Sequence, residues 1–250
     1  MKRSSLKAQL IYRILLVMVG ITGCILGLIN KGAHCLLFYT YWSGWFATIV
    51  AILTLVSTII QLVKGEIEGY NRYVPILKFT ANIFIIATFI VAGFVLPDKI
   101  WSVGYWTYPT GIFYHFLLPI MTVLDAVLFD RKRSYRVSYP FFAVIPSLLY
   151  WIVIISRFLV YRSSIGGTIP ESQWGDYYPY GFTNIDKSAS LGGLIGLLAG
   201  ILVGLILIGF GYWAINKLVK GEDGKTKFIK GVDEEEMSDL IHVIKEKKSK

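Results

Sequence analysis

Two polar side chains, Thr40 and His115, have the residue types needed for nucleophilic acyl transfer. Each stands in a long stretch of sequence that contains no charged residue. A threonine alcohol becomes a nucleophile when a neutral imidazole removes its proton, and it can then attack the carbonyl carbon of an ester. Of the three histidines, only His115 falls within a predicted apolar helix. The two side chains therefore predict an ester hydrolase, provided that the fold brings them together.

The distribution of charge marks the elements that must position this pair. Six runs contain no Asp, Glu, Lys or Arg: residues 14–30, 32–63, 79–97, 100–124, 137–156 and 188–216. These runs cover 142 of the 250 residues, so all 41 charged side chains fall in the other 108. Helices of a soluble domain keep a polar face, whereas a bilayer core needs roughly 20 apolar residues per helix. The pattern excludes a soluble enzyme, a nucleic-acid-binding domain and a disordered chain.

The sequence predicts an all-α fold that consists of a bundle of six transmembrane helices. The helices are expected over residues 9–30, 38–62, 74–97, 110–129, 139–161 and 190–215. They form one membrane domain over residues 1–215, and a charged tail follows over residues 216–250. An acidic run at 233–236 opens a short amphipathic helix in this tail, which is expected to rest on the cytoplasmic membrane surface or the cytoplasmic loops.

Lys and Arg residues are distributed unequally between the two sides of the predicted bundle. The two terminal tails and the second and fourth connecting segments together hold 18 of the 25, and the opposite side holds four. Basic residues are enriched on the cytoplasmic side of membrane proteins. We therefore predict a multi-pass protein of the cell membrane with both termini in the cytoplasm. The net charge of +9 then reflects topology, and no nucleic-acid partner is expected.

In this orientation, Thr40 and His115 are expected at similar depth. The second and fourth helices both run inward, which places the two residues roughly 4–8 Å below the outer end. Pro119 cannot donate to the carbonyl of residue 115, so the helix is expected to kink at the histidine. Asp125 lies about 15 Å deeper. It is expected to pair with Arg13 or Lys78 and not to orient the imidazole.

Two further residues are candidate substrate-binding groups, and one segment has two interpretations. Ser43 lies one helical turn after Thr40, where it is expected to help stabilise an oxyanion, and Arg157 is expected to hold a substrate carboxylate. The connection over residues 161–187 is long and rich in aromatic side chains. It predicts either a lid or binding segment, or an aromatic belt at the lipid headgroups.

The cysteines and glycines predict packing and no metal chemistry. Cys24 and Cys35 are expected to be unpaired, and no His or Cys set has the spacing of metal ligands, so neither a metal nor a cofactor is expected. Residues 1–24 resemble a lipoprotein signal, but the apolar run continues past the cysteine, which disfavours cleavage. A stripe of glycines favours close helix packing, within the protein or across a homodimer seam. Its members are Gly192, Gly196, Gly200 and Gly204.

An ordered set of short motifs resembles the androgen-induced membrane-protein family and its bacterial six-pass relatives. The similarity covers roughly residues 9–215, and the order of the motifs carries it more than any single one. The motifs are Phe38-Tyr39-Thr40, His115 with Leu118-Pro119, Leu124-Asp125, Leu128-Phe129-Asp130, Tyr139-Pro140 and Tyr178-Pro179-Tyr180. The run 41–45 departs from the bacterial relatives, which usually have a more polar sequence there.

The resemblance implies a function and assigns roles to two residues. Animal members of the family are intramembrane threonine hydrolases that cleave fatty acid esters of hydroxy fatty acids with a threonine and a histidine. The positions of these residues match Thr40 as the nucleophile and His115 as the general base. The resemblance thus implies a lipid-ester hydrolase that acts on a membrane lipid or fatty-acyl ester. The alternative is a non-enzymatic multi-pass protein, a transporter or a binding or scaffold protein, that has this fold without the chemistry.

Overall fold

The structure, a computed structural model, describes residues 5–66, 75–95, 109–187 and 190–218. Every regular element within these residues is a helix, which confirms the predicted all-α fold class. The amphipathic helix predicted in the C-terminal tail lies outside the described residues.

The long helices follow the predicted spans, and shorter turns interrupt or join them. The long helices are α1 (Leu6–Lys31), α2 (Tyr39–Val63), α3 (Pro75–Ile90), α5 (Leu118–Phe129), α7 (Ile145–Ile165) and α9 (Leu191–Leu218). The short α-helices are α4 (Pro109–Ile112), α6 (Tyr139–Ala143) and α8 (Trp174–Tyr177). The π-helical turns are η2 (Val91–Val95) and η4 (Phe113–Leu117), and the 3-10 turns are η1 (Gly32–Leu37), η5 (Glu171–Gln173) and η6 (Gly181–Thr183).

Five helical segments of the described residues are long and apolar enough to cross a membrane. They are Leu6–Leu37, Tyr39–Val63, Pro75–Phe94, Tyr139–Ile165 and Leu191–Leu218. A sixth apolar segment, Phe113–Phe129, is shorter. It belongs to the predicted fourth span, which is helical over residues 109–129 and contains the π turn η4. The described residues thus provide five to six membrane-crossing helices.

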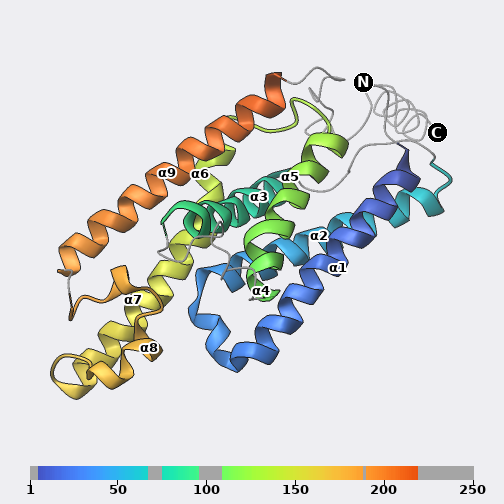
Figure 1. The fold of residues 1–250 in the computed structure, drawn as a ribbon. Coiled ribbons are helices and arrows are strands. Elements are labelled where there is room, and N and C mark those ends of the chain that lie inside the picture. The colour runs from blue at the N-terminus through green and yellow to red at the C-terminus, as the bar shows by residue number, and fades with distance from the viewer. Residues whose placement is uncertain (1–4, 67–74, 96–108, 188–189, 219–250) are drawn as a thin grey trace, which may run out of the picture.

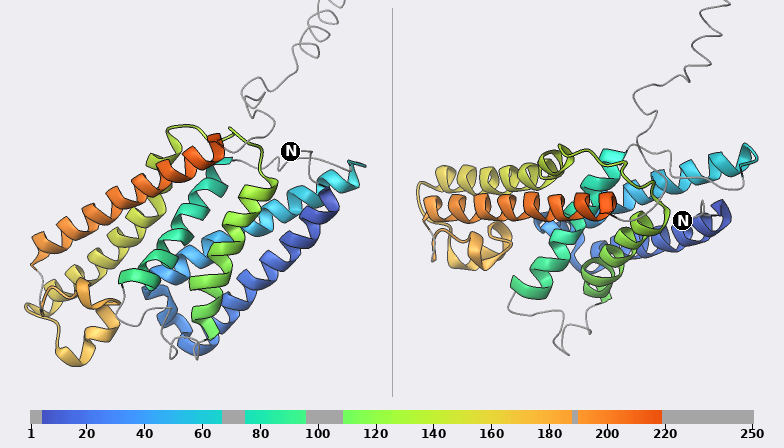
Figure 2. Two further views of the ribbon diagram at one scale, coloured as in Figure 1. Left: turned by 45° about the horizontal axis from the view of Figure 1, so that its top comes forward. Right: turned by 90° about the horizontal axis from the view of Figure 1, so that it is seen from above.

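The α3 helix lies at the centre of the bundle. It contacts α2, α5, α6 and α9, while α1 and α2 pack together on one side and α6, α7 and α9 lie on the other (Figures 1 and 2). Aromatic rings fill much of the space between these layers; Tyr39, for example, stacks against Trp151 and meets Phe84 edge to face. The layers therefore enclose a core even though most outward faces are apolar.

Charged side chains join the helices at one end of the bundle, which we call the ionic end. Arg13 near the start of α1 donates to Asp125 near the end of α5 over 3.0 Å, and Lys78 near the start of α3 pairs with the same carboxylate. Lys78 also donates to Asp130 over 2.5 Å. The expected pairing of Asp125 is confirmed, with both cations and not only one. Because these helix ends meet, consecutive helices run in opposite directions.

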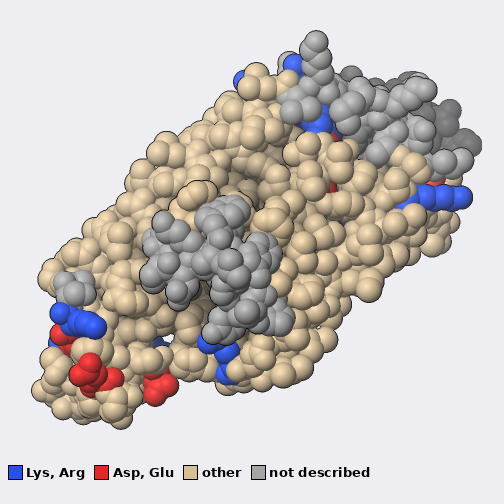
Figure 3. Space-filling view, viewed as in Figure 1, with Lys and Arg blue, Asp and Glu red and all other residues tan. Residues whose placement is uncertain are grey.

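The surface between the two ends of the bundle is apolar. Large apolar side chains are exposed along the outward faces of the long helices, among them Met18 on α1, Ile49 on α2, Leu149 on α7 and Leu207 on α9. On the face that Figure 3 shows, the described charged side chains lie towards the two ends of the molecule. These features are those of an integral, multi-pass membrane protein.

Three of the four glycines in the α9 stripe make no close contact with the rest of the described chain. A Cβ added at Gly196, Gly200 or Gly204 would meet no atom within 4 Å. The close packing that the stripe favours is therefore not made within the described residues. The homodimer seam stays a prediction.

Candidate functional site

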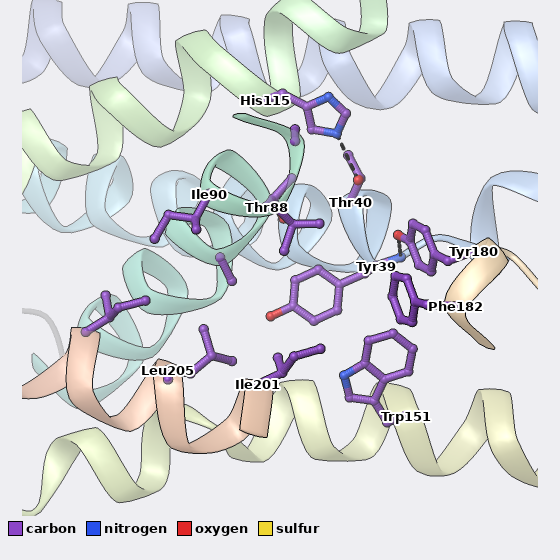
Figure 4. A pocket seen from close by; sticks show the side chains of 15 residues that line it. Tyr39, Thr40, Thr88, Ile90, His115, Trp151, Tyr180, Phe182, Ile201 and Leu205 are labelled. Atoms are coloured by element: carbon purple, nitrogen blue, oxygen red, sulfur yellow. Dashed lines mark hydrogen bonds between the residues drawn. The ribbon is translucent and has the colours of Figure 1, made fainter. Parts of the chain in front are cut away.

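The structure brings Thr40 and His115 together. Thr40 Oγ1 and His115 Nε2 are 2.9 Å apart and hydrogen-bonded, although the residues are 75 positions apart in the sequence. Figure 4 shows the pair at the wall of a cavity. When the imidazole is neutral and carries its proton on Nδ1, the Thr40 hydroxyl donates to Nε2. This is the geometry required of a nucleophile and its general base.

Thr40 is held in the first turn of α2. Phe38 precedes the helix in an extended conformation, so α2 begins at Tyr39. Ser43, one turn further on, is fully buried and donates to the carbonyl of Thr40 over 3.0 Å. The Ser43 oxygen also lies 2.6 Å from Thr88 Oγ1 on α3. These bonds fix the first turn of α2 against α3 and thereby fix the direction of the Thr40 side chain.

His115 is held by the π turn η4. Pro119 has no N–H, so the carbonyl of His115 cannot accept the usual helical bond from residue 119. The chain forms a wider turn here, in which the N–H of Leu118 donates to the carbonyl of Phe113, five residues back. The distortion predicted at the histidine thus takes the form of a π turn, a feature found frequently at functional sites.

The packing of Tyr114 fixes the position of η4 in the bundle. Its fully buried ring lies between Gly23 on α1 and Gly44 on α2, where an added Cβ would approach ring atoms to 2.5 and 2.7 Å. Its hydroxyl donates to Cys24 Sγ over 2.9 Å. The two glycines leave the space that the ring needs, so they set the position of η4 and of the neighbouring His115.

The cavity beside the pair has a volume of about 200 Å³ and a largely apolar wall. Its apolar lining comes from α3, η2, α7, η6 and α9: Ala87, Ile90, Val91, Ala92, Trp151, Phe182, Ile201, Gly204, Leu205 and Ile208. Side chains with a polar group also line it: Tyr39, Thr40, Thr88, His115 and Tyr180. Figure 4 shows the pair on one side and Ile201 and Leu205 on the other. A cavity of this kind suits a hydrocarbon chain next to a polar reacting group.

The connection between α7 and α9 supplies part of this wall. Tyr180 and Phe182 line the cavity. Asp186 holds the connection together, because its carboxylate accepts from the Tyr178 hydroxyl over 2.7 Å and from the backbone N–H of Ile169 over 3.0 Å. Burial, together with the bond to Asp186, raises the pKa of Tyr178 to about 12. The structure thus favours the binding-segment interpretation for residues 180–182 and leaves the aromatic-belt interpretation open for the rest.

The hydroxyl of Tyr180 lies beside Thr40. The backbone N–H of Tyr39 donates to it over 3.0 Å, and the Thr40 side chain lies next to it (Figure 4). Burial raises the pKa of Tyr180 to about 12, and the bond from Tyr39 limits the rise. The sequence motif that contains Tyr180 drew attention to it without assigning a role. Several tyrosines share the segment, and the sequence does not tell which of them reaches Thr40.

The two predicted substrate-binding residues do not line the cavity. Ser43 is buried behind the wall, where it bonds to Thr40 and Thr88. Arg157 is exposed on α7, donates to the carbonyl of Asp176 and lies 4.7 Å from the centre of the Tyr177 ring. The roles assigned to Ser43 and Arg157 stay predictions, and the structure gives each of them other contacts.

The thiols and carboxylates of the described residues form no evident metal centre. Cys24 and Cys35 are free thiols, as expected. No group of three or more His, Cys, Asp or Glu side chains that could hold a metal ion occurs in the part of the chain that the structure describes. The predicted independence from metals and cofactors is not tested by this finding.

Comparisons with known proteins assign the chain to no group. No protein-family model, no curated protein and no solved structure matches it. The resemblance to the androgen-induced membrane-protein family therefore stays a prediction from sequence motifs.

Proposed function

We propose that this protein is an integral membrane lipid-ester hydrolase in which Thr40 is the nucleophile and His115 the general base. The observation that supports it best is the 2.9 Å hydrogen bond between Thr40 Oγ1 and His115 Nε2 at the wall of an apolar cavity. Buried threonines of apolar helices usually bond back to their own helix. Thr54 and Thr58 of α2 do so, through the carbonyls of Ala51 and Thr54. Thr40 instead bonds to an imidazole.

The first half-reaction transfers the acyl group to the protein. His115 Nε2 takes the proton of the Thr40 hydroxyl while Oγ1 attacks the ester carbonyl carbon, which gives a tetrahedral oxyanion. The oxyanion collapses and breaks the bond to the alcohol oxygen, which takes the proton from the imidazolium. The products are a free alcohol and an acyl ester of Thr40.

The second half-reaction regenerates the protein. His115 Nε2 takes a proton from water as the water oxygen attacks the acyl carbon. Collapse of the second tetrahedral oxyanion expels Thr40 Oγ1, which recovers a proton from the imidazolium. The carboxylic acid leaves with its hydrocarbon chain, which in the bound state lies between α3 and α9.

The membrane topology inferred from charge extends this proposal. With both termini in the cytoplasm, the end of the bundle that carries Thr40, which we call the site end, faces the outside of the cell membrane. An amphiphilic ester then enters sideways from the outer leaflet. The protein acts as a monomer or as a homodimer that packs through the Gly192 to Gly204 stripe.

Active-site labelling tests the proposal directly. The purified protein is treated with a fluorophosphonate probe, and its hydrolysis of a p-nitrophenyl ester of a medium-chain fatty acid is measured in detergent. Thr40→Ala is expected to abolish labelling and to lower kcat by on the order of 10³-fold or more. His115→Ala is expected to lower kcat by on the order of 10²–10⁴-fold, because it removes the base and leaves the alcohol.

Thr54→Ala is the matched control, because Thr54 is a buried threonine of α2 that lies away from the cavity. It is expected to label and to hydrolyse the ester like the wild type. Unchanged labelling in Thr40→Ala would overturn the proposal. Binding of the ester without hydrolysis by the wild type would favour the alternative, a lipid-binding or transport protein that uses the same apolar cavity.

A further inference from the structure

Acyl transfer by the Thr40–His115 pair also requires a group that stabilises the oxyanion. Attack on an ester places negative charge on the carbonyl oxygen, and hydrogen-bond donors aimed at that oxygen provide a large part of the rate enhancement in acyl transfer. Among the described residues, four other side chains with a polar hydrogen line the cavity. They are Tyr39, Thr88, Trp151 and Tyr180.

Three of these four side chains are poorly placed to donate to the oxyanion. Ser43 uses its proton on the carbonyl of Thr40, so Thr88 must donate its own proton to Ser43. The Tyr39 hydroxyl is bonded to Ser147 over 2.6 Å. Trp151 lies across the cavity from Thr40 (Figure 4), where its N–H has no partner among the described residues.

On the basis of the proposed function, we infer that Tyr180 is a further catalytic residue, whose hydroxyl donates to the ester carbonyl oxygen as that oxygen becomes negative. The backbone N–H of Tyr39, the residue before Thr40, donates to the Tyr180 oxygen over 3.0 Å. The Thr40 side chain lies next to the same hydroxyl. The phenol is thus held at the first turn of α2, beside the nucleophile (Figure 4).

The hydrogen bonds around Tyr180 suit it to this role. A hydroxyl whose oxygen accepts an N–H bond becomes a stronger donor through its own proton. The first turn of α2 also contributes the positive end of the helix dipole. Because the pKa of Tyr180 is raised to about 12 by burial, the phenol keeps its proton at neutral pH. When an ester binds, the phenol proton of Tyr180 is donated to the carbonyl oxygen.

A purely structural role would make Tyr180 a tether between the α7–α9 connection and α2. The two roles differ in the proton that they use. The tether needs only the Tyr180 oxygen as an acceptor for the N–H of Tyr39, and a tyrosinate still accepts this bond. Catalysis needs the phenol proton as well. Deprotonation of Tyr180 should therefore stop catalysis and leave the tether in place.

The first experiment measures kcat and KM for the p-nitrophenyl ester with Tyr180→Phe. Loss of one oxyanion donor is expected to lower kcat on the order of 10²-fold. KM should stay within about twofold, because the donated bond forms mainly in the transition state. Tyr161→Phe is the matched control, since it removes a tyrosine hydroxyl at the start of the same connection whose partner, Gln173, lies away from the cavity. It is expected to keep the wild-type kcat.

The second experiment places difluorotyrosine, a more acidic phenol, at position 180 and follows kcat as the pH rises. The alkaline loss of kcat should move to lower pH than in the wild type, after subtraction of the rate measured with Thr40→Ala. An unshifted alkaline limb, or wild-type kcat in Tyr180→Phe, would overturn the role of Tyr180 while Thr40-dependent hydrolysis persists. Failure of the proposed function would look different, because Thr40→Ala would then retain labelling.

Discussion

Asp125 lies between two cations in surroundings that exclude water. Arg13 and Asp125 are both 0% exposed, and Lys78 is 4% exposed. A buried charge is tolerated only when its partners offset the loss of hydration, so removal of one partner leaves a charge uncompensated. The residues are far from Thr40 along their helices and belong to no catalytic step that we propose. Their contribution is therefore expected in stability and not in kcat.

Asp125→Asn is expected to destabilise the protein by about 3–5 kcal/mol, because Arg13 then loses its carboxylate partner and Lys78 keeps only Asp130. The measurement is the midpoint of thermal unfolding in detergent. Glu171→Gln is the control, since Glu171 is an exposed carboxylate in the connection to α9, and its midpoint should stay near the wild-type value. A wild-type midpoint in Asp125→Asn would contradict this account of the ionic end.

For single residues, the sequence predicted which polar side chains pair better than it predicted the direction in which each side chain points. Thr40, His115 and Asp125 stood out because polar groups are costly in apolar helices, so each needed a partner at its own depth. Ser43 had the expected one-turn spacing from Thr40, yet its hydroxyl turns toward Thr88 and away from the cavity. Side-chain direction depends on which hydrogen-bonding partners the neighbouring helices supply. Spacing along a single helix does not carry that information.

The position of His115 depends on how η4 packs against α1 and α2. A Cβ at Gly44 would come within 2.7 Å of two Tyr114 ring atoms, and the ring is enclosed on its other side by Gly23. Gly44→Ala is expected to cost about 1–3 kcal/mol through overpacking. It should also displace His115 from Thr40, so that fluorophosphonate labelling falls together with the unfolding midpoint.

Gly211→Ala provides the comparison for this helix-packing effect. Gly211 lies in α9, and a Cβ there would meet no atom within 4 Å, so the same substitution adds a methyl group to open space. It is expected to leave labelling unchanged and to raise the midpoint slightly, since alanine favours a helix more than glycine does. Equal effects of the two substitutions would show that the Tyr114 ring does not determine the position of η4.

The distribution of charged residues predicted the long helices. It predicted only some of the points at which these helices are interrupted. Pro119 predicted a distortion at His115, because a missing N–H has a local consequence. The π turn at Val91–Val95 had no comparable signal, and it places Val91 and Ala92 in the cavity wall. The break at Val144 between α6 and α7 precedes Pro146 by two residues and was also not predicted. Such breaks reflect tertiary packing as well as local sequence.

For the molecule as a whole, the sequence did not determine which helices lie side by side in the bundle. The predicted spans are apolar on all sides, so no stripe marks which face of α9 meets the bundle. The structure places Leu194, Leu198 and Leu205 inward and leaves Leu207 exposed. The cavity depends on this order, because α9 supplies its wall opposite Thr40. The residue pair was therefore predictable from depth, and the cavity was not.

The proposed orientation makes a prediction about which end of the bundle is reachable from outside the cell. Thr168 is exposed in the connection at the site end, and Val137 is exposed in the connection at the ionic end. In intact cells, a membrane-impermeant maleimide should label Thr168→Cys and should label Val137→Cys only after permeabilisation. The wild type gives the background level of maleimide labelling. This level is expected to be low, because Cys35 is buried and Cys24 accepts a hydrogen bond from Tyr114.

The labelling pattern decides which lipids can reach Thr40. The helix α1 begins and the helix α9 ends at the ionic end. One orientation of the bundle therefore fixes the side on which each described connection lies. Labelling of Val137→Cys in intact cells, with Thr168→Cys protected, would place the site end in the cytoplasm. The hydrolase chemistry would then draw its ester from the inner leaflet, since Thr40 lies in the first turn of α2 and so remains near whichever surface the site end faces.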